Sequence, residues 1–504
     1  MKRAVLSFLW ISVIVTGVFL RFEHLDKRPF HADEATGARI TARRMESGAN
    51  QFDPQHFHGP MLADLTIPLC KLRAETRWQE MTKATLRTLP AMAGALLVLL
   101  PLFWRRRYGD AAMGLAAAIL ATSPLLVYYS RMFIHESLLV LFGMLALMSL
   151  TRNPRWGIPG LLIGLMFATK ESFAISLIAW SGAGLLIALE SRKWPERAIW
   201  VSAWHLYRWP VGLCLLAATV TAAGIYTDGF QHPQGAFDAL RTFFVYKTGV
   251  GHDKSIGYYA KLLALPQKSG GVWWFGTPAV GLAIFAYLNT FRRDPAATPG
   301  RSLIRFLAYA AVGHVVIYSL IAYKTPWLAC LPWAHVCLLA GFALTGFRHH
   351  GRPIQIALVV LATGCLVTQF QQARRATGRY ASDERNPYAY VPTRNDIETL
   401  EPWLWKLRQV APGGSLEPVG VVGTDYWPLP WYLRSFDRVG YWPTPGDDLT
   451  QFPLVFALPE SAAAVVKSLE KSHVAVLKGL RAEVPVYVFV RADIWKRWME
   501  TDRQ

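Results

Sequence analysis

The stretch "TLRTLPAMAGALLVLLPLFWRRR", residues 85–107, decides the fold class, because a long apolar run ends directly in three arginines. A helix of about 20 mainly apolar residues spans the hydrocarbon core of a bilayer. Similar runs recur from the N-terminus to about residue 370. Of the 504 residues, 53% are hydrophobic and 17% are charged, whereas soluble proteins carry charge on about a quarter of their residues. The sequence therefore predicts a polytopic α-helical membrane protein.

We expect about eleven transmembrane helices. The predicted segments lie near 4–20, 85–104, 110–129, 134–150, 156–169, 172–189, 208–226, 272–290, 303–322, 326–346 and 354–370. Two of them, 134–150 and 156–169, are short for a span. The first segment resembles a signal peptide, but no small-residue cleavage site follows it, so we expect an uncleaved first span.

Basic residues predict the orientation of these spans. With Met1 in the cytoplasm, every short loop on that side is basic, as the positive-inside rule requires. These loops contain Arg105–Arg107, Arg152, Arg155, Arg192, Lys193, Arg197, Arg292, Arg293, Arg301, Arg348 and Arg352. We therefore attribute the net charge of +19 to the basic cytoplasmic loops. No patch of basic and aromatic residues points to nucleic-acid binding. The predicted location is the cytoplasmic (inner) membrane, with the first long loop, 21–84, outside.

Residues 371–504 have a different pattern and follow a transmembrane domain at 1–370. Short β-rich runs at 418–423, 453–458 and 484–491 alternate with helical patterns such as 459–472. This alternation predicts a small α/β domain, which the odd number of spans places outside the membrane. No phosphate-loop or dinucleotide motif is present. Four of the five cysteines lie in predicted spans without metal-type spacing, as expected of apolar fillers.

Five polar clusters fall at the outer ends of helices or in outer loops. They are "HADEA" (31–35), "FHGP" (57–60), "SRMFIHES" (130–137), "TKES" (169–172) and "YKTP" (323–326). Chance would scatter such clusters over both membrane faces. Their convergence on one face predicts a functional site there.

Asp33 and Glu34 are the candidate catalytic residues. Adjacent carboxylates at a membrane surface can supply a general base and a group that positions substrate. The alternative is a solvated helix N-terminus, where the helix dipole favours acids. No cofactor is indicated by the sequence. A divalent metal near Asp33 is compatible with the pair, although the lack of a DxD spacing weakens an interpretation based on metal alone.

The second cluster adds histidines, and we expect both of them to bind substrate. His56 and His58 share a face of an extended stretch, and a Gly-Pro turn follows His58. His58 can donate to a phosphate or orient a carboxylate. Two histidines with two carboxylates could also hold a metal. The alternative is an ordinary loop histidine at the interface.

Cations of the remaining clusters are candidate ligands for a phosphate. Arg131 can clamp a phosphate with its planar fork, and Lys170 and Lys324 place charge beside hydrocarbon. The alternative is that these side chains snorkel to the interface. Two acids, Glu136 and Glu171, accompany them as further substrate-binding candidates, and His135 is a weaker one. Together, cations for a lipid phosphate and a carboxylate base describe sugar transfer from a polyprenyl-phosphate donor.

The order of these motifs resembles the GT-C superfamily of membrane glycosyltransferases, in particular the protein O-mannosyltransferase-like branch, glycosyltransferase family 39. More narrowly, "HADEA", "HGPML", "TKES", "YKTPWL", "SDERNPYAYVPT" (382–393) and "DYWPLPWYLR" (425–434) resemble the prokaryotic flippase-activity-associated proteins. The likeness covers nearly the whole chain. No insertion like the lumenal β-trefoil is present, so the protein acceptor of the mannosyltransferases does not carry over.

By position, the resemblance implies a GT-C fold and an inverting transfer to an extracytoplasmic glycan, lipid or protein. Asp33 matches the acidic residue that acts as base or acceptor ligand, and Glu34 matches its neighbour. Arg131 matches an arginine at the donor phosphate. A further set, which follows the last span and is implied to cap the site, comprises Asp383, Glu384, Arg385 and Asn386.

Two other functions remain open from the sequence. One is an auxiliary protein or transporter partner of a lipid-linked sugar flippase, which would need polar residues through the midplane of several spans. Only His314 and His335 stand out there, and packed histidines are the simpler interpretation. The other is an assembly protein whose 371–504 domain binds a partner.

Overall fold

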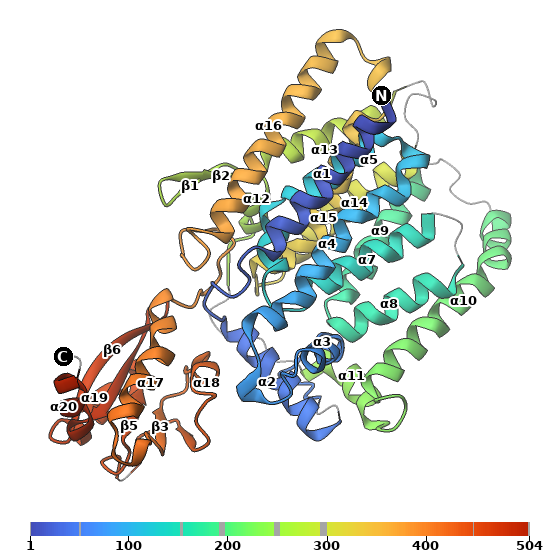
Figure 1. The fold of residues 1–504 in the computed structure, drawn as a ribbon. Helices are drawn as coiled ribbons and strands as arrows, with labels where there is room; N and C mark the ends of the chain where they lie inside the picture. The colour runs from blue at the N-terminus through green and yellow to red at the C-terminus, as the bar shows by residue number, and fades with distance from the viewer. Residues whose placement is uncertain are drawn as a thin grey trace.

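The computed structural model describes residues 2–49, 52–151, 155–190, 197–245, 253–292, 300–446 and 448–501. Long helices form a bundle, and a small domain that contains the C-terminus lies at one end of it (Figure 1). Of the basic residues that predicted the orientation, Arg152, Arg192, Lys193 and Arg293 lie outside the described residues.

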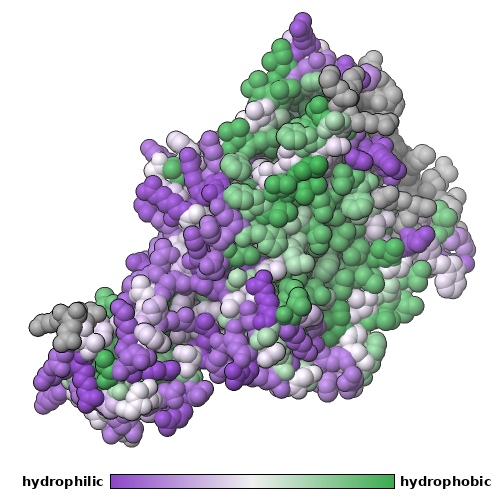
Figure 2. Space-filling view, in the orientation of Figure 1, coloured by the Kyte–Doolittle hydropathy of each residue, from purple (hydrophilic) through white to green (hydrophobic). Residues whose placement is uncertain are grey.

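Helices occupy all eleven predicted positions. Within the described ranges, seven are long and apolar enough to cross a membrane: α1 (Lys2–Phe22), α4 (Lys83–Tyr108), α9 (Phe173–Glu190), α10 (Arg197–Tyr226), α14 (Arg301–Leu320), Pro326–Leu344, which includes α15 (Cys330–Gly341), and α16 (Arg352–Thr377). A bent pair, α5 (Asp110–Thr122) and α6 (Pro124–Ser130), provides an eighth. Three shorter apolar helices complete the set: α7 (Glu136–Thr151), α8 (Gly157–Thr169) and α13 (Thr277–Asn289). A broad apolar surface covers the bundle (Figure 2), as expected of a polytopic membrane protein.

Helix α8 is stable despite its 13 residues because it packs closely on α10. A Cβ at Gly160 would lie 2.2 Å from the carbonyl oxygen of Cys214, and one at Gly164 would lie 2.6 Å from that of Ala218. Small residues let two helix backbones approach, which is a common packing mode in membranes.

The chain bends by 56° between α5 and α6, and a charged side chain binds the backbone at this bend. Arg21, in the last turn of α1, is fully buried and donates to the carbonyl oxygens of Leu120 and Ala121 at 2.9 and 3.1 Å. It also donates to the Gly17 carbonyl of its own helix. The guanidinium therefore satisfies carbonyls that the broken span leaves unpaired, which is the condition for irregular backbone at membrane depth.

Most of the remaining short elements connect successive spans. They are α2 (Ala32–Ser47), α3 (Met61–Leu72), η1 (Trp78–Glu80), α11 (Gln234–Val245), α12 (Tyr258–Leu263) and the hairpin of β1 (Gln267–Ser269) and β2 (Val272–Trp274). The hairpin shortens the predicted span 272–290, because Gly270 and Gly271 adopt positive φ and turn the chain before α13 begins.

The C-terminal region contains a five-stranded mixed sheet in the order β4-β3-β5-β7-β6. Its strands are β3 (Val419–Val422), β4 (Val439–Trp442), β5 (Leu454–Ala457), β6 (His473–Arg481) and β7 (Val484–Arg491). Its helices are α17 (Leu400–Val410), α18 (Leu429–Tyr432), α19 (Pro459–Leu469) and α20 (Ala492–Thr501). The three predicted strands and the helix at 459–472 are confirmed as β3, β5, β7 and α19, whereas β4 and β6 were not predicted.

Aromatic side chains hold this domain against the long loop between α1 and α4. The ring of Trp431 lies 4.1 Å from that of Phe30 and 5.5 Å from that of Trp78, centroid to centroid. The hydroxyl of Tyr432 accepts a hydrogen bond from the Phe30 amide at 2.9 Å. These buried contacts belong to one hydrophobic core that continues into the helical bundle, so the domain is fixed beside this loop.

Candidate functional site

All five polar clusters contribute to one cavity of about 550 Å³, which we call the central cavity. Its polar lining comes from α2, the 56–58 loop, the start of α7, the α8–α9 hinge and the segment after α14. The charged and imidazole groups that line it are Asp33, His56, His58, His135, Glu136, Lys170 and Glu171. Six of these seven are candidate site residues from the sequence; His135 was the weaker suggestion.

Asp33 is the second residue of α2, and its side chain is 53% exposed. His31 caps the helix and its Nδ1 accepts from the Asp33 amide at 3.1 Å, while the Asp33 carboxylate lies 3.8 Å from that nitrogen. Among the described residues, no hydrogen bond to the Asp33 carboxylate is found. The cap therefore holds the backbone of Asp33 and leaves its carboxylate available to the cavity.

Glu34 has the opposite environment and does not line the central cavity. It is fully buried, and Arg87 donates to both of its oxygens at 2.7 Å. The amides of Phe133 and His31 donate to the same carboxylate at 2.8 and 3.0 Å. Burial by itself would raise the pKa of Glu34, but Arg87 outweighs it and the pKa falls to about 2. This geometry favours a supporting role for Glu34 at the start of α2, and the catalytic role expected from its place beside Asp33 stays a prediction.

His58 and Glu171 form a pair across the cavity. Nδ1 of His58 lies 2.9 Å from Oε2 of Glu171, at the hinge between α8 and α9. Burial would raise the pKa of Glu171, but the adjacent His58 offsets this and the pKa falls to about 2, so the imidazole nitrogen is the donor. Gly59 permits the approach, because a Cβ there would lie 2.1 Å from the Ala168 carbonyl oxygen at the end of α8.

Lys170 and Glu136 form a second pair, which is buried. Nζ of Lys170 donates to Oε1 of Glu136 at 2.5 Å, with both side chains about one-twentieth exposed. Apolar side chains complete the cavity wall: Ile40, Phe57, Phe133, Ile134, Ala174, Ile175, Phe243, Ile321 and Leu328. The cavity thus joins an apolar wall to ion pairs, a combination that suits a lipid-linked polar molecule.

Arg131 does not line the central cavity, which differs from the single cluster expected from the sequence. It lines a second cavity of about 500 Å³, which we call the basic cavity, together with Lys27, Arg28, Arg87, Arg374, Arg379, Glu23, Glu398 and uncharged residues. The sequence predicts a membrane face for Arg131 but not its position around the bundle.

The other predicted residues lie at or beyond the edges of these cavities. His56 is half exposed and its Nδ1 pairs with Asp53 at 2.8 Å. Lys324 is buried beside the central cavity and donates to the Ile321 carbonyl at 2.5 Å. Asp383 pairs with Arg385, and Glu384 lies 3.7 Å from Arg394; both lie outside the two cavities. Among the described residues, no group of three or more His, Cys, Asp or Glu side chains is arranged to hold a metal ion.

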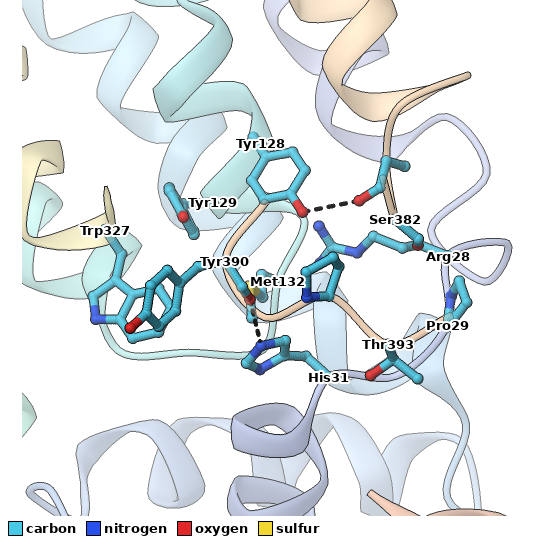
Figure 3. A pocket seen from close by; sticks show the side chains of 12 residues that line it. Arg28, Pro29, His31, Tyr128, Tyr129, Met132, Trp327, Ser382, Tyr390 and Thr393 are labelled. Atoms are coloured by element: carbon cyan, nitrogen blue, oxygen red, sulfur yellow. Dashed lines mark hydrogen bonds between the residues drawn. The ribbon is translucent and has the colours of Figure 1, made fainter. Parts of the chain in front are cut away.

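A narrow pocket between the two cavities contains residues that the motifs did not single out (Figure 3). It shares Trp327 with the central cavity, and Arg28, Ala381 and Ser382 with the basic cavity. His31 donates through Nε2 to the Tyr390 carbonyl at 3.0 Å, because its Nδ1 accepts from Asp33.

Two tyrosines of α6 close the other side of this pocket. Tyr128 donates to the carbonyl of Ala381 at 2.9 Å, and Tyr129 donates to that of Tyr388 at 2.5 Å. The run 382–393 is therefore a strap that crosses the site, held by side chains of the N-terminal half. Asn386 fixes the bend of this strap through bonds to the carbonyls of Ala376 and Tyr380.

Comparisons with known proteins address the fold. Residues 12–223 match the family model for dolichyl-phosphate-mannose-protein mannosyltransferase. No curated protein matches the chain. Among solved structures, ArnT from Cupriavidus metallidurans in the apo state is similar over 98% of this chain and 99% of its own, at 15% identity and a TM-score of 0.64. The same protein bound to undecaprenyl phosphate is similar over 96% and 98%, at 15% identity and a TM-score of 0.61.

A second relative is the archaeal oligosaccharyltransferase AglB from Archaeoglobus fulgidus, solved in complex with an inhibitory peptide and a dolichol-phosphate. The likeness covers 90% of this chain and 69% of that one, at 13% identity and a TM-score of 0.54. The expectation from the sequence motifs is confirmed: the chain has the GT-C fold of membrane glycosyltransferases, with a protein-mannosyltransferase-like N-terminal region.

Proposed function

We propose that this protein transfers a sugar from a polyprenyl-phosphate donor to an extracytoplasmic acceptor, with Asp33 as the general base. The observation that carries the proposal is the state of the three carboxylates that line the central cavity. Glu136 and Glu171 are ion-paired, whereas the half-exposed Asp33 accepts no hydrogen bond from another described residue. Only Asp33 is therefore available to take a proton from an attacking group.

The proposed reaction is a single displacement at the anomeric carbon. The acceptor oxygen bonds to that carbon from one face, its proton passes to Asp33, and the bond to the phosphate oxygen breaks on the other face. Polyprenyl phosphate leaves with inversion. Lys170 and His58 line the same cavity, and cations or N–H donors there would stabilise the charge that develops on the phosphate.

The apolar side of the cavity suits the donor lipid. Helix α11 lines the cavity through Thr242 and Phe243, and its exposed side chains include Phe237, Leu240 and Phe244. A helix with an exposed apolar face at the edge of a membrane protein lies in the interface. The fold relative solved with undecaprenyl phosphate supports the same donor class.

The decisive test replaces Asp33 with Asn and measures transfer from a polyprenyl-phosphate sugar to cell-envelope glycans in membranes that lack the endogenous protein. Loss of a general base costs about 10²–10⁴-fold in rate, so we expect transfer to fall at least a hundredfold. Asp26→Asn is the matched control, because Asp26 is an exposed acid of the same loop outside the cavity.

Two results would count against the proposal. Full transfer by Asp33→Asn would remove the base assignment. Flipping of the lipid-linked sugar by the purified wild type, with no transfer in the presence of acceptor, would instead favour the auxiliary role in a flippase system.

The orientation belongs to the same proposal, with the N-terminus cytoplasmic in the inner membrane and both cavities and the C-terminal domain outside. Single cysteines at Asp26 and Arg106, in a background without exposed native cysteines, test it. A membrane-impermeant maleimide should label the first and spare the second in intact cells.

A further inference from the structure

A pocket of about 260 Å³ lies between the C-terminal domain and the loop that joins α1 to α4, and we call it the interdomain pocket. Gln79 of η1 lines one side, and α17, α18 and the residues that follow α18 line the rest. None of its described lining residues belongs to the cavities described above. Small-molecule pockets usually enclose about 300–1,000 Å³, so this smaller pocket suits one unit of a longer molecule.

Trp405 gives the pocket an exposed aromatic face. Glu401, Trp405 and Arg408 follow one another at spacings of four and three residues, so they lie on one face of α17. Trp405 is 64% exposed, whereas Leu404 and Phe436 beside it in the pocket are buried. A single exposed tryptophan needs no ligand on its own account, but this ring lies among polar groups with unused hydrogen-bonding capacity.

Four polar side chains of the pocket retain such capacity. Arg434 donates through Nη1 to Oε1 of Glu401, and within the described chain no hydrogen bond to Nη2 of Arg434 or to Oε2 of Glu401 is found. The guanidinium carbon of Arg408 lies 4.8 Å from the centroid of the Phe436 ring, and Arg408 has no ion pair in the described ranges. Gln79 is exposed, and its amide likewise forms no hydrogen bond with another described residue.

A sugar matches this combination of groups. The C–H bonds of a pyranose ring form an apolar face that stacks on an indole ring. Its hydroxyls both donate and accept, so they satisfy guanidinium and amide donors as well as a carboxylate acceptor. A lipid chain would instead cover these polar groups without bonding to them, which is unfavourable.

The pocket is attached to the start of the helix that carries Asp33. Tyr432 lines the pocket, and its hydroxyl accepts from the Phe30 amide at 2.9 Å. Phe30 precedes Asp33 by three residues, which span at most about 11 Å. The Tyr432 hydroxyl therefore lies within about 14 Å of the Asp33 backbone, a distance that a short oligosaccharide can span.

We infer that the interdomain pocket binds a saccharide unit of the acceptor, so that the acceptor carries an oligosaccharide. The inference rests on the proposed transfer and adds the chemical class of its acceptor. Trp405 supplies the stacking surface, and Arg408 and Glu401 bind the hydroxyls. With one unit held there, another part of the same saccharide can reach Asp33.

The experiment measures binding without turnover. The probe is the soluble saccharide fraction that mild acid releases from the envelope of a strain lacking the protein, because this fraction contains unmodified acceptor. It is titrated onto the purified full-length protein in nanodiscs, and binding is followed by biolayer interferometry. Trp405→Ala and Arg408→Gln should each weaken binding at least about fivefold. Trp405→Tyr keeps an aromatic ring and should retain most of the affinity.

Two variants outside the pocket are matched controls. Trp273→Ala removes an exposed tryptophan of β2, and Lys406→Gln removes an exposed cation of α17; neither residue lines the pocket. Both variants should bind as the wild type does. Raising the salt concentration distinguishes the kind of sugar, because screening weakens only charged contacts. A loss of affinity would indicate an acidic saccharide and no change a neutral one; both results support the inference.

Transfer kinetics connect the pocket to the acceptor. Trp405→Ala should raise the apparent KM for the saccharide fraction at least about fivefold and leave the KM for the polyprenyl-phosphate sugar unchanged. An unchanged acceptor KM would overturn the assignment to the acceptor.

Two binding results would overturn the saccharide site itself. One is wild-type affinity in both Trp405→Ala and Arg408→Gln, and the other is no binding of the fraction to the wild type. A wild type that binds the fraction but transfers no sugar would retain the saccharide site and remove the proposed function. The two proposals can therefore fail separately.

Discussion

Glu34→Gln separates the two adjacent carboxylates of the first outer loop by their effects on stability. The wild-type carboxylate accepts two hydrogen bonds from Arg87 and one each from two amides, with no exposed surface. The fall of its pKa from 4.5 to about 2, at about 1.4 kcal/mol for each pKa unit, corresponds to about 3 kcal/mol of stabilisation at neutral pH. Breaking a buried ion pair on one side costs about 3–5 kcal/mol, in agreement with that value.

We therefore expect Glu34→Gln to destabilise the folded protein by about 3 kcal/mol and to lower the apparent melting temperature by about 3 °C, because a chain of 504 residues has an unfolding entropy of about 1 kcal/mol/K. The measurement is thermal unfolding in detergent, followed by tryptophan fluorescence at a fixed scan rate. Asp33→Asn should change the melting temperature by less than about 1 °C, because its carboxylate is half exposed and makes no hydrogen bond to the described chain. The residual Glu34→Gln protein should retain measurable transfer below its melting temperature, whereas Asp33→Asn should not.

The pH dependence gives an independent check. A carboxylate with a lowered pKa contributes its full stabilisation above the unfolded value and loses it as the pH falls through the folded value. The difference in stability between wild type and Glu34→Gln should be constant from pH 5 to pH 8 and should shrink from pH 4.5 towards pH 2. A Glu34→Gln protein as stable as the wild type, yet as inactive as Asp33→Asn, would refute the structural role of Glu34.

Three further predictions follow from other contacts. Gly59→Ala should displace the His58 turn from α8, because the added Cβ would lie 2.1 Å from the Ala168 carbonyl oxygen. We expect a loss of about 1–3 kcal/mol in thermal stability and reduced transfer. Gly182→Ala is the control, because its added Cβ would meet no atom within 4 Å. His58→Gln and Glu171→Gln should couple in a double-mutant cycle of transfer rates by about 1–3 kcal/mol, and additive effects would show that their 2.9 Å contact does not contribute. Arg21→Met should lower the melting temperature, and Arg21→Lys should restore it only in part, because one ammonium cannot reproduce the fork that reaches Gly17, Leu120 and Ala121. Arg106→Gln, at an exposed position, should have no effect. Full rescue by Arg21→Lys would contradict this account.

The spans could be predicted because length and apolarity are local properties of the sequence. Even the short α7 and α8 occur where apolar runs placed them, and the strands β3, β5 and β7 occur at the predicted β-rich runs. The bend between α5 and α6 was not predicted, because its stabilising partner, Arg21, is about 100 residues away in the chain. Such pairing is a tertiary property, which hydropathy does not contain.

The candidate site was predicted in composition but not in arrangement. The predicted topology assigns each residue to a membrane face, and residues of all five polar clusters do line one cavity. It does not assign a position around the bundle, so Arg131 and Asp33 were expected together, although they line different cavities. Arg87, which distinguishes Glu34 from Asp33, had a signal in the sequence: it is a cation inside a predicted span, and such residues usually have a partner.

The strap at 382–393 has a consequence for engineering. It is both the covalent link to the C-terminal domain and part of the lining of the narrow pocket, through Ser382, Tyr390, Pro392 and Thr393. The carbonyls of Tyr388 and Tyr390, and that of Ala381 directly before the strap, accept bonds from α6 and His31. Thr393 continues this attachment by donating to the Phe30 carbonyl. Chimeras that exchange the C-terminal domain should therefore join after Thr393, because a junction at the end of α16 would also replace this lining.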